Sequence, residues 1–578
     1  MTVESKQQQP ASLLAARVIV DELVRLGCRE AVVCPGSRSA PLARALFEAD
    51  AAGWLRLHVR IDERAAAFLA TGLAAESGAV TPVVTTSGSA VANLLPAFVE
   101  AQYSAPQKRI PVLALTADRP ASYAGVGANQ TITQAELLAD AVSAHFDLDA
   151  TATTEADNAM LRARVCRLVA AGLPAHLNVR FVEPLVPNEA DAVESAKQWG
   201  QLIPAGRPRQ QPWTNIEAAS AQESSFELDL TRKTLVIAGS GATELESLAE
   251  VPTIAEPDAF APTNPVHPLA AVTLQQIKPE QIVVLGRPTL HRPIAQLLAD
   301  KNIEVTVVAP DTADLSQGGV GYPDVTANAR RVVSSIRGVG AVDKQWQKVA
   351  EAASQYAVNA VRETLQQSVE QRWLSGLHVA AAVTDSLRTG DALVLGASNA
   401  VRDASWMGLP FAGVDVIAGR GAAGIDGTIA RAIGHALVRD RRYAQEIRPP
   451  RTIALLGDLT FLHDAGALAI GPGEPRPENL TIVVANDTGG GIFETLEPAA
   501  EHVRNSFERI FGTPQDVDIA ALCQAYDVAH VLVDDMETLL AQLHPDTDVE
   551  GIRVVEVTTA RDTRRELHQE MQRKAKLD

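Results

Sequence analysis

Two acidic turns near the end of the sequence carry its strongest chemical signal. In GDLTFLHD (457–464) and VVANDTGGGIFE (483–494), the acidic residues stand at the end of an apolar run that is typical of a buried strand. The interval between Asp458 and Asp487 suits one helix and one strand, so a parallel sheet would bring both carboxylates to the same edge. Magnesium is usually held by one or two carboxylates and the phosphates of a ligand. We therefore predict that these turns bind Mg²⁺ and a diphosphate, with added N–H donors from the helix that opens at Asp458.

A plainer interpretation of each turn stays open. Asp458 could cap a helix, and Asn486–Asp487 could form an ordinary turn without a ligand. The prediction depends on the two turns occurring together.

A third carboxylate, Glu63, lies in HVRIDERAAAFLATGLA (58–74), at the start of an Ala-rich helix that follows a β-type run. A glutamate at a helix start is often explained by the helix dipole alone. An acid that shares a proton during catalysis needs an apolar setting, which Ile61, Phe68 and Leu69 would supply. Glu63 is therefore the first candidate for a catalytic residue.

Arginine recurs in turns that are rich in glycine or small residues. A single surface arginine is usually a solvated ion-pair partner, but its recurrence at the ends of strands predicts a shared site for anions, since the guanidinium binds carboxylates bidentately. The segments are CPGSRSAPL (34–42), ADRP (117–120), GANQTITQ (127–134), TLHRP (289–293), GASNAVRD (396–403) and GRGAAGIDG (419–427), of which GANQTITQ carries polar side chains in place of arginine.

The elements that must position these residues alternate between strands and helices, which predicts an α/β fold of three doubly wound parallel-sheet domains. We expect the domains at 1–190, 191–373 and 374–578, with a linker at 203–213 and a long helix at 342–374. In such sheets, ligands bind beyond the carboxyl ends of the strands. The expected strands are 31–35, 82–87, 111–117 and 176–182, then 234–242, 281–288 and 303–310, then 392–398, 414–419, 452–458, 480–487, 530–534 and 552–559. The first domain also has expected helices at 12–27, 62–75 and 90–100.

Composition narrows the choice of partners. The 578 residues include 51 Lys and Arg against 70 Asp and Glu, a formal net charge of −19. This balance disfavours nucleic acid and anionic membrane surfaces and favours small molecules, with local arginines capturing any anion. The four cysteines lack metal-ligand spacing, and no window approaches the roughly 20 apolar residues of a membrane span, so we expect a cytoplasmic location.

The chain resembles the SEPHCHC synthases (2-succinyl-5-enolpyruvyl-6-hydroxy-3-cyclohexene-1-carboxylate synthases), a family of thiamine-diphosphate-dependent enzymes. The resemblance covers nearly the whole length, although it is weak in the middle domain. It is strongest at PGSRSAPL, IDERAAAFLA, TSGSAVANLLPAFVEA, ADRP, GANQ and RGAAGIDG. The two acidic turns are similar to the family's cofactor signature, except that Asp487 stands where many members have asparagine. Aspartate is an equally hard oxygen ligand, and Asn486 could share the role.

The resemblance implies thiamine diphosphate and Mg²⁺, or alternatively Mn²⁺, as cofactors. It implies a pyrimidine-binding first domain, a central domain and a diphosphate-binding third domain. Glu63 would activate the cofactor through its aminopyrimidine ring, and Asp458, Asp487 and the carbonyl of Gly489 would bind the metal. The other cofactor contacts would be Ser398, Ile425, Leu459, Thr460, Asn486 and Ile492; the substrate contacts would be Ser37, Arg38, Arg119, Asn129, Gln130, Arg292, Arg402, Arg420 and Phe493, with Ser398 near both ligands.

The implied reaction is decarboxylation of 2-oxoglutarate and conjugate addition of the remaining carbons to isochorismate, which gives SEPHCHC in menaquinone biosynthesis. Because Glu63 and the metal turns fall in different domains, the family pattern implies a homodimer or a dimer of dimers with active sites between subunits. An acetohydroxyacid synthase or a simple 2-oxo acid decarboxylase is an alternative, which the IDERAAAF and GSRSAP segments fit poorly. A non-catalytic nucleotide-binding protein is suggested only by GSGA (239–242), which is not a full dinucleotide fingerprint.

Overall fold

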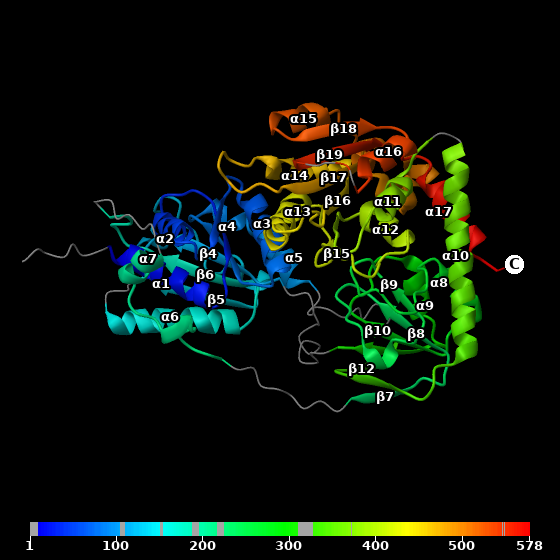
Figure 1. Ribbon diagram of the computed structural model, residues 1–578, viewed down its shortest axis with the longest axis horizontal. Helices are drawn as coiled ribbons and strands as arrows, with labels where there is room; N and C mark the ends of the chain where they lie inside the picture. Colours follow the sequence, from blue (N-terminus) through cyan, green and yellow to red (C-terminus); the bar gives the residue numbers. More distant parts are fainter. Residues whose placement is uncertain are drawn as a thin grey trace, which may run out of the picture.

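Three parallel sheets flanked by helices form the computed structural model, which describes residues 10–104, 110–150, 154–187, 196–216, 225–309, 328–370, 373–545, 547 and 550–577 (Figure 1). Every pair of named strands within these residues is parallel. The α/β class with parallel sheets is confirmed.

The first sheet has six strands in the order β2-β1-β3-β4-β6-β5. The helix expected at 90–100 is two helices, because Pro96 lacks the N–H that a continuous helix would bond at that position. The strands are β1 (Glu30–Val33), β2 (Arg56–Val59), β3 (Thr81–Thr85), β4 (Val112–Asp118), β5 (Ala144–Asp149) and β6 (Ala175–Arg180). The helices are α1 (Ala11–Arg25), α2 (Ala40–Ala51), α3 (Glu63–Ser77), α4 (Ser89–Ala92), α5 (Leu95–Gln102) and α6 (Glu155–Ala170), followed by α7 (Ala196–Leu202).

The second sheet has five strands in the order β12-β11-β10-β8-β9, beside a two-stranded sheet of β13 and β7. The long expected helix is α10 (Lys344–Glu370), which runs along one edge of the molecule next to α17 (Figure 1). The strands are β7 (Phe226–Asp229), β8 (Thr234–Ala238), β9 (Thr253–Ala255), β10 (Gln281–Leu285), β11 (Glu304–Val308), β12 (Ala329–Val333) and β13 (Ile336–Val339); the remaining helices are α8 (Ala270–Ile277) and α9 (Arg292–Leu298).

The third sheet has the order β15-β14-β16-β17-β19-β18, which repeats the order of the first sheet strand for strand. Its strands are β14 (Ala392–Leu395), β15 (Asp415–Ala418), β16 (Thr452–Gly457), β17 (Asn479–Asn486), β18 (Ala529–Val533) and β19 (Gly551–Thr558). Its helices are α11 (Gly376–Asp385), α12 (Asn399–Trp406), α13 (Thr428–Arg442), α14 (Asp458–Asp464), α15 (Ile519–Ala525), α16 (Met536–Leu543) and α17 (Arg564–Lys574). All six strands expected for this part of the chain are present.

Each sheet lies within one of the three expected domain ranges. The boundaries themselves stay a prediction, and the one near residue 190 falls in 188–195, which lies outside the described residues.

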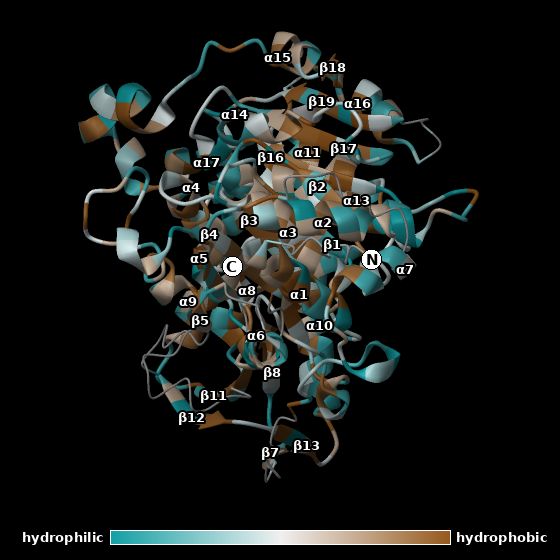
Figure 2. Cartoon of the chain, turned by 90° about the vertical axis from the view of Figure 1, so that its left-hand side faces the viewer, coloured by the Kyte–Doolittle hydropathy of each residue, from teal (hydrophilic) through white to brown (hydrophobic). Residues whose placement is uncertain are grey.

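Helices α3 and α13 join the first and third sheets within the chain. A Cβ added to Gly72 would lie 2.3 Å from the carbonyl oxygen of Arg431, and one added to Gly434 would lie 2.6 Å from that of Leu69. These glycines let the two backbones approach closely, and one core of buried residues runs through both helices. Hydrophobic residues concentrate in the interior while many outer loops are hydrophilic (Figure 2). Among the described helices, none combines the length and the apolar character that crossing a membrane requires.

Candidate active site

The two acidic turns meet at the carboxyl edge of the third sheet. Gly457, the last residue of β16, pairs with Ala485 of β17, so Asp458 and Asp487 leave neighbouring strands at the same edge. Both line a cavity of about 380 Å³. The predicted convergence of the two turns is what the tertiary structure shows.

Most of the residues expected in the third domain line this cavity, which we name the cofactor cavity after the predicted ligand. They are Ser398, Arg402, Arg420, Ile425, Asp458, Leu459, Thr460, Asp487, Gly489, Ile492 and Phe493. Asn486 is outside the lining: its amide donates to Glu556 Oε1 at 2.7 Å, and its Oδ1 accepts from the backbone N–H of Thr488 at 3.0 Å. The side chain of Asn486 therefore stabilises the turn. Because Asn486 does not line the cavity, the structure does not support its expected contact with the cofactor.

The carboxylate pair fits a hard divalent cation. Burial raises the pKa of Asp458 to about 6. Burial and then the charge of Asp458 raise the pKa of Asp487 to about 7. A divalent cation would offset the repulsion between two such groups. A Cβ added to Gly491 would lie 1.9 Å from Asp487 Oδ2, so the glycine turn passes directly against this carboxylate.

The opposite wall of the cavity is cationic. Ser398 has a φ of 69°, a strained conformation for a serine, and it caps helix α12. Arg402 of that helix donates to the carbonyl oxygen of Ser398 at 2.5 Å, and Arg420 donates to Thr289 Oγ1 at 2.6 Å. Burial and then the charge of Arg420 lower the pKa of Arg402. Within the described part of the chain, neither guanidinium forms an ion pair with a carboxylate, so the pair suits an anionic ligand.

A buried ion pair supports this wall, and the sequence did not identify it. Asp403 Oδ1 and Oδ2 accept from Arg564 Nη1 and Nη2 at 2.7 and 2.8 Å. The amide oxygen of Asn399 accepts from Arg564 Nε at 3.2 Å and from the N–H of Ile492 at 3.0 Å. Asp403 stands in the quoted GASNAVRD segment, but Arg564 belongs to no recognisable motif, so only the fold connects them.

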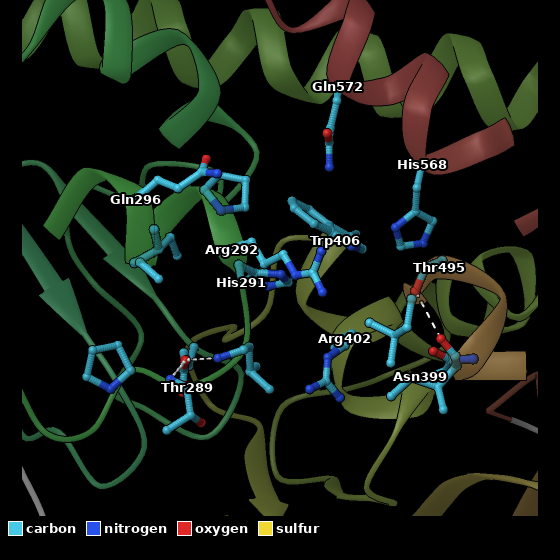
Figure 3. Close-up of a pocket in the computed structure, with 18 of the residues that line it drawn as sticks. Thr289, His291, Arg292, Gln296, Asn399, Arg402, Trp406, Thr495, His568 and Gln572 are labelled. Carbon is cyan, nitrogen blue, oxygen red and sulfur yellow. Dashed lines mark hydrogen bonds between the residues drawn. The ribbon is translucent and has the colours of Figure 1, made fainter. Parts of the chain in front are cut away.

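A larger cavity of about 810 Å³ adjoins the first between α9, α12 and α17 (Figure 3). It shares Asn399, Arg402 and Ile492 with the cofactor cavity. Arg292 lies here rather than in the cofactor cavity. The wall also carries His291, whose ring lies 4.2 Å from that of Trp406 and whose pKa is lowered to about 3 by burial and then by the charge of Arg402.

The residues expected from the first domain gather at the carboxyl edge of the first sheet and line neither cavity of the single chain. Glu63 accepts from Asn93 Nδ2 at 3.1 Å, and Gln130 donates to the carbonyl oxygen of Ser87 at 2.8 Å. Arg38 donates to Glu183 Oε1 at 3.3 Å. The others are Ser37, Arg119 and Asn129, which follow β1 or β4.

Two of the three apolar residues expected around Glu63 are buried in the single chain. Phe68 and Leu69 are buried, but Ile61 is 77% exposed because it lies in the turn that precedes α3 and faces away from the core of its own chain.

Comparison with known proteins agrees with this geometry. Residues 14–140 match the family model for the thiamine pyrophosphate enzyme N-terminal TPP-binding domain. The chain is 45% identical to the 2-succinyl-5-enolpyruvyl-6-hydroxy-3-cyclohexene-1-carboxylate synthase of Mycobacterium avium over 571 residues, which span 96% of this chain and 98% of the relative. It is 47% identical to the enzymes of the same name from Mycobacteroides abscessus and Nocardia farcinica, with the same shares covered.

The chain belongs to the SEPHCHC synthase family. As a member of the SEPHCHC synthases it is a thiamine-diphosphate-dependent enzyme. The match to the N-terminal TPP-binding domain spans the edge that carries Glu63. The cofactor cavity at the third sheet lies outside that match. The alignment with the SEPHCHC synthase of M. avium, in contrast, covers 96% of this chain.

Proposed function

We propose that this enzyme decarboxylates 2-oxoglutarate and adds the remaining succinyl-semialdehyde unit to isochorismate, giving SEPHCHC for menaquinone biosynthesis. The observation that carries the proposal is the gathering of a carboxylate pair and the arginines Arg402 and Arg420 around one cavity, in a chain similar to SEPHCHC synthases along its length.

The cofactor would occupy the cavity at the carboxyl edge of the third sheet. Thiamine diphosphate, when bound, supplies the nucleophilic carbon and accepts the electrons released when CO₂ leaves. Asp458, Asp487 and the carbonyl of Gly489 would hold Mg²⁺, or alternatively Mn²⁺, against the diphosphate. Ile425 and Ile492 would pack on the cofactor from the cavity wall. Leu459 and Thr460, in the first turn of α14, also lie beside this space.

The arginines would hold the substrates. Both 2-oxoglutarate and isochorismate carry two carboxylates, which matches guanidinium groups that form no ion pair within the described chain. The adjoining cavity provides space for a second, bulkier substrate beside the first, with Arg292 on its wall. Phe493 and Ser398 border the region where the two substrates would meet.

The missing half of the site would come from a second copy of the chain. Glu63 and the substrate residues of the first domain, Ser37, Arg38, Arg119, Asn129 and Gln130, would then cover the cofactor cavity of the partner. The same edge of the first sheet exposes apolar side chains, with Ile61 77%, Val126 70% and Tyr123 50% exposed. Burial of such side chains against another subunit is favourable, which supports a homodimer or a dimer of dimers.

Mixing two inactive variants tests this arrangement. Glu63→Gln and Asp487→Ala damage different halves of the proposed site, so coexpressed subunits should recover activity in heterodimers that contain one intact site. Activity that stays at the level of the separate variants would contradict sites shared between subunits.

The reaction itself is tested by mixing purified protein with 2-oxoglutarate, isochorismate, thiamine diphosphate and Mg²⁺ and following the loss of isochorismate. Isochorismate loss that requires every component supports the proposal. Faster decarboxylation of pyruvate than of 2-oxoglutarate would favour an acetohydroxyacid synthase or a simple decarboxylase. Calorimetric binding of NAD in place of thiamine diphosphate would contradict both enzyme interpretations.

A further inference from the structure

A buried glutamate of the second sheet fixes a turn that reaches the third. Glu256 follows β9 and is 2% exposed. Its Oε1 accepts from the backbone N–H groups of Thr289 and, at 2.8 Å, of Leu290. Its Oε2 accepts from the N–H of Ser240 at 3.3 Å. One carboxylate therefore sets the backbone of a turn that follows β10, which is separated from β9 by β8 in the sheet.

The same turn contacts the substrate arginine proposed above. Thr289 Oγ1 accepts from Arg420 Nη2 at 2.6 Å, so the contacts lead from Glu256 through Thr289 to Arg420. Arg287, two residues before Thr289, donates to the carbonyl oxygen of Gly421 at 2.9 Å and also to that of Arg420. In Figure 3, dashed lines mark the hydrogen bonds at Thr289, which forms part of the cavity wall together with Arg292 and Arg402.

These contacts hold arginines that repel one another. Arg420 lies close enough to Arg287 and to Arg402 for its charge to lower the pKa of each, after the larger effect of burial. Mutually repelling guanidiniums need hydrogen bonds to stay in one arrangement. Burial and then the charge of Asp258 raise the pKa of Glu256 to about 7, so both protonation states are populated near neutral pH, and each keeps an oxygen that can accept from the turn.

We propose that Glu256 is a positioning residue: through Thr289 it holds the Arg420 guanidinium in the orientation that receives a substrate carboxylate. The proposal rests on the proposed function, because it assigns Arg420 to a substrate. It extends the active site into the second sheet, to a residue that lines the adjoining cavity but not the cofactor cavity.

The test compares steady-state kinetics of the wild type with Arg420→Ala, Glu256→Ala, Glu256→Gln and Thr289→Val. Arg420→Ala first shows which substrate's apparent KM depends on the arginine. Glu256→Ala and Thr289→Val should then raise that same KM about 3- to 10-fold, the effect of one lost or misplaced hydrogen bond, with kcat and the Kd for thiamine diphosphate nearly unchanged. Glu256→Gln should return KM to near the wild-type value, since its amide oxygen still accepts from Thr289 and Leu290 and only the 3.3 Å contact with the Ser240 N–H loses its acceptor.

Asp258→Asn is the matched control. Asp258 is also buried, and its Oδ2 accepts from Ser240 Oγ at 2.6 Å. The variant removes a charge that acts on Glu256 but none of the hydrogen bonds that Glu256 accepts from the 289–290 turn, so we expect its KM to stay near that of the wild type. Combining Glu256→Ala with Thr289→Val should raise KM no further than Glu256→Ala alone, because both act through one contact.

The proposal is overturned if Glu256→Ala lowers kcat and cofactor affinity while leaving the KM that Arg420 controls unchanged, or if Glu256→Gln fails to recover it. Should Glu256→Ala not fold, Thr289→Val carries the test, and an unchanged KM in that variant refutes the idea. A wild type that turns over neither substrate refutes the proposed function instead. Crystal structures of wild type and Thr289→Val would then decide the positioning role, by whether the Arg420 guanidinium moves.

Discussion

Replacing Arg564 with methionine should destabilise the folded protein through the carboxylate it leaves behind. Asp403 and Arg564 are only 2% and 5% exposed, and both oxygens of Asp403 accept from the guanidinium. Removing one partner of a buried ion pair costs about 3–5 kcal/mol, because the remaining charge is neither solvated nor compensated. For a cooperative unit of a few hundred residues, each kcal/mol lowers Tm by roughly 2–4 °C. We therefore expect a fall in Tm of about 6–20 °C.

Arg565→Met is the control on the adjacent position. Arg565 is only half-buried and donates to the carbonyl oxygen of Leu496 at 3.0 Å, so its loss should cost about 0.5–1.5 kcal/mol. Thermal unfolding of both variants in the absence of cofactor measures the difference. Asp403→Leu combined with Arg564→Met should recover much of the lost stability, since it leaves no buried charge.

A second readout of Arg564→Met is cofactor binding. The charge of Arg564 lowers the pKa of Asp487, and its Nε holds Asn399 at the cavity wall. We expect the variant to bind thiamine diphosphate and Mg²⁺ more weakly in calorimetry. A Tm equal to that of Arg565→Met, with unchanged cofactor affinity, would refute the assignment of a stabilising role to the ion pair.

Three further predictions concern the site and the fold. Glu63→Gln should keep its fold by circular dichroism and slow hydrogen–deuterium exchange at the cofactor C2; wild-type exchange would remove Glu63 from the mechanism. Arg402→Ala and Arg420→Ala should each raise an apparent KM by about 10- to 100-fold or abolish turnover, because a lost charge-assisted contact costs about 1.5–3 kcal/mol. Unchanged steady-state kinetics in both variants would contradict the anion site. Gly72→Ala should lower the free energy of unfolding by about 1–3 kcal/mol, because the added methyl group would clash with the carbonyl oxygen of Arg431. Thermal unfolding measures this effect, and an unchanged Tm would show that α3 and α13 can move apart without cost.

The sequence alone determined the elements whose signals are local. Buried parallel strands are continuous apolar runs, so all six strands of the third sheet were predictable, and so was the placing of Asp458 and Asp487 directly after two of them. In the first sheet, β2 was recognised only as a β-type run before Glu63 and β5 was missed, because four to six residues with mixed burial resemble the surrounding loops. A helix-breaking proline inside 90–100 was visible, but its effect on the helix was not predicted.

Contacts between distant residues were decided by the tertiary structure. Asp403 and Arg564 are far apart in the chain, as are Asn486 and Glu556, and no spacing rule connects either pair. The turn at Thr289 gained its contact with Arg420 only because the second and third sheets pack together. Local sequence sets which backbone conformation a segment prefers, whereas the partner of a polar side chain depends on which surfaces the core brings into contact. That is why the residue types of the site could be predicted from the sequence, while the side chains that hold them in place could not.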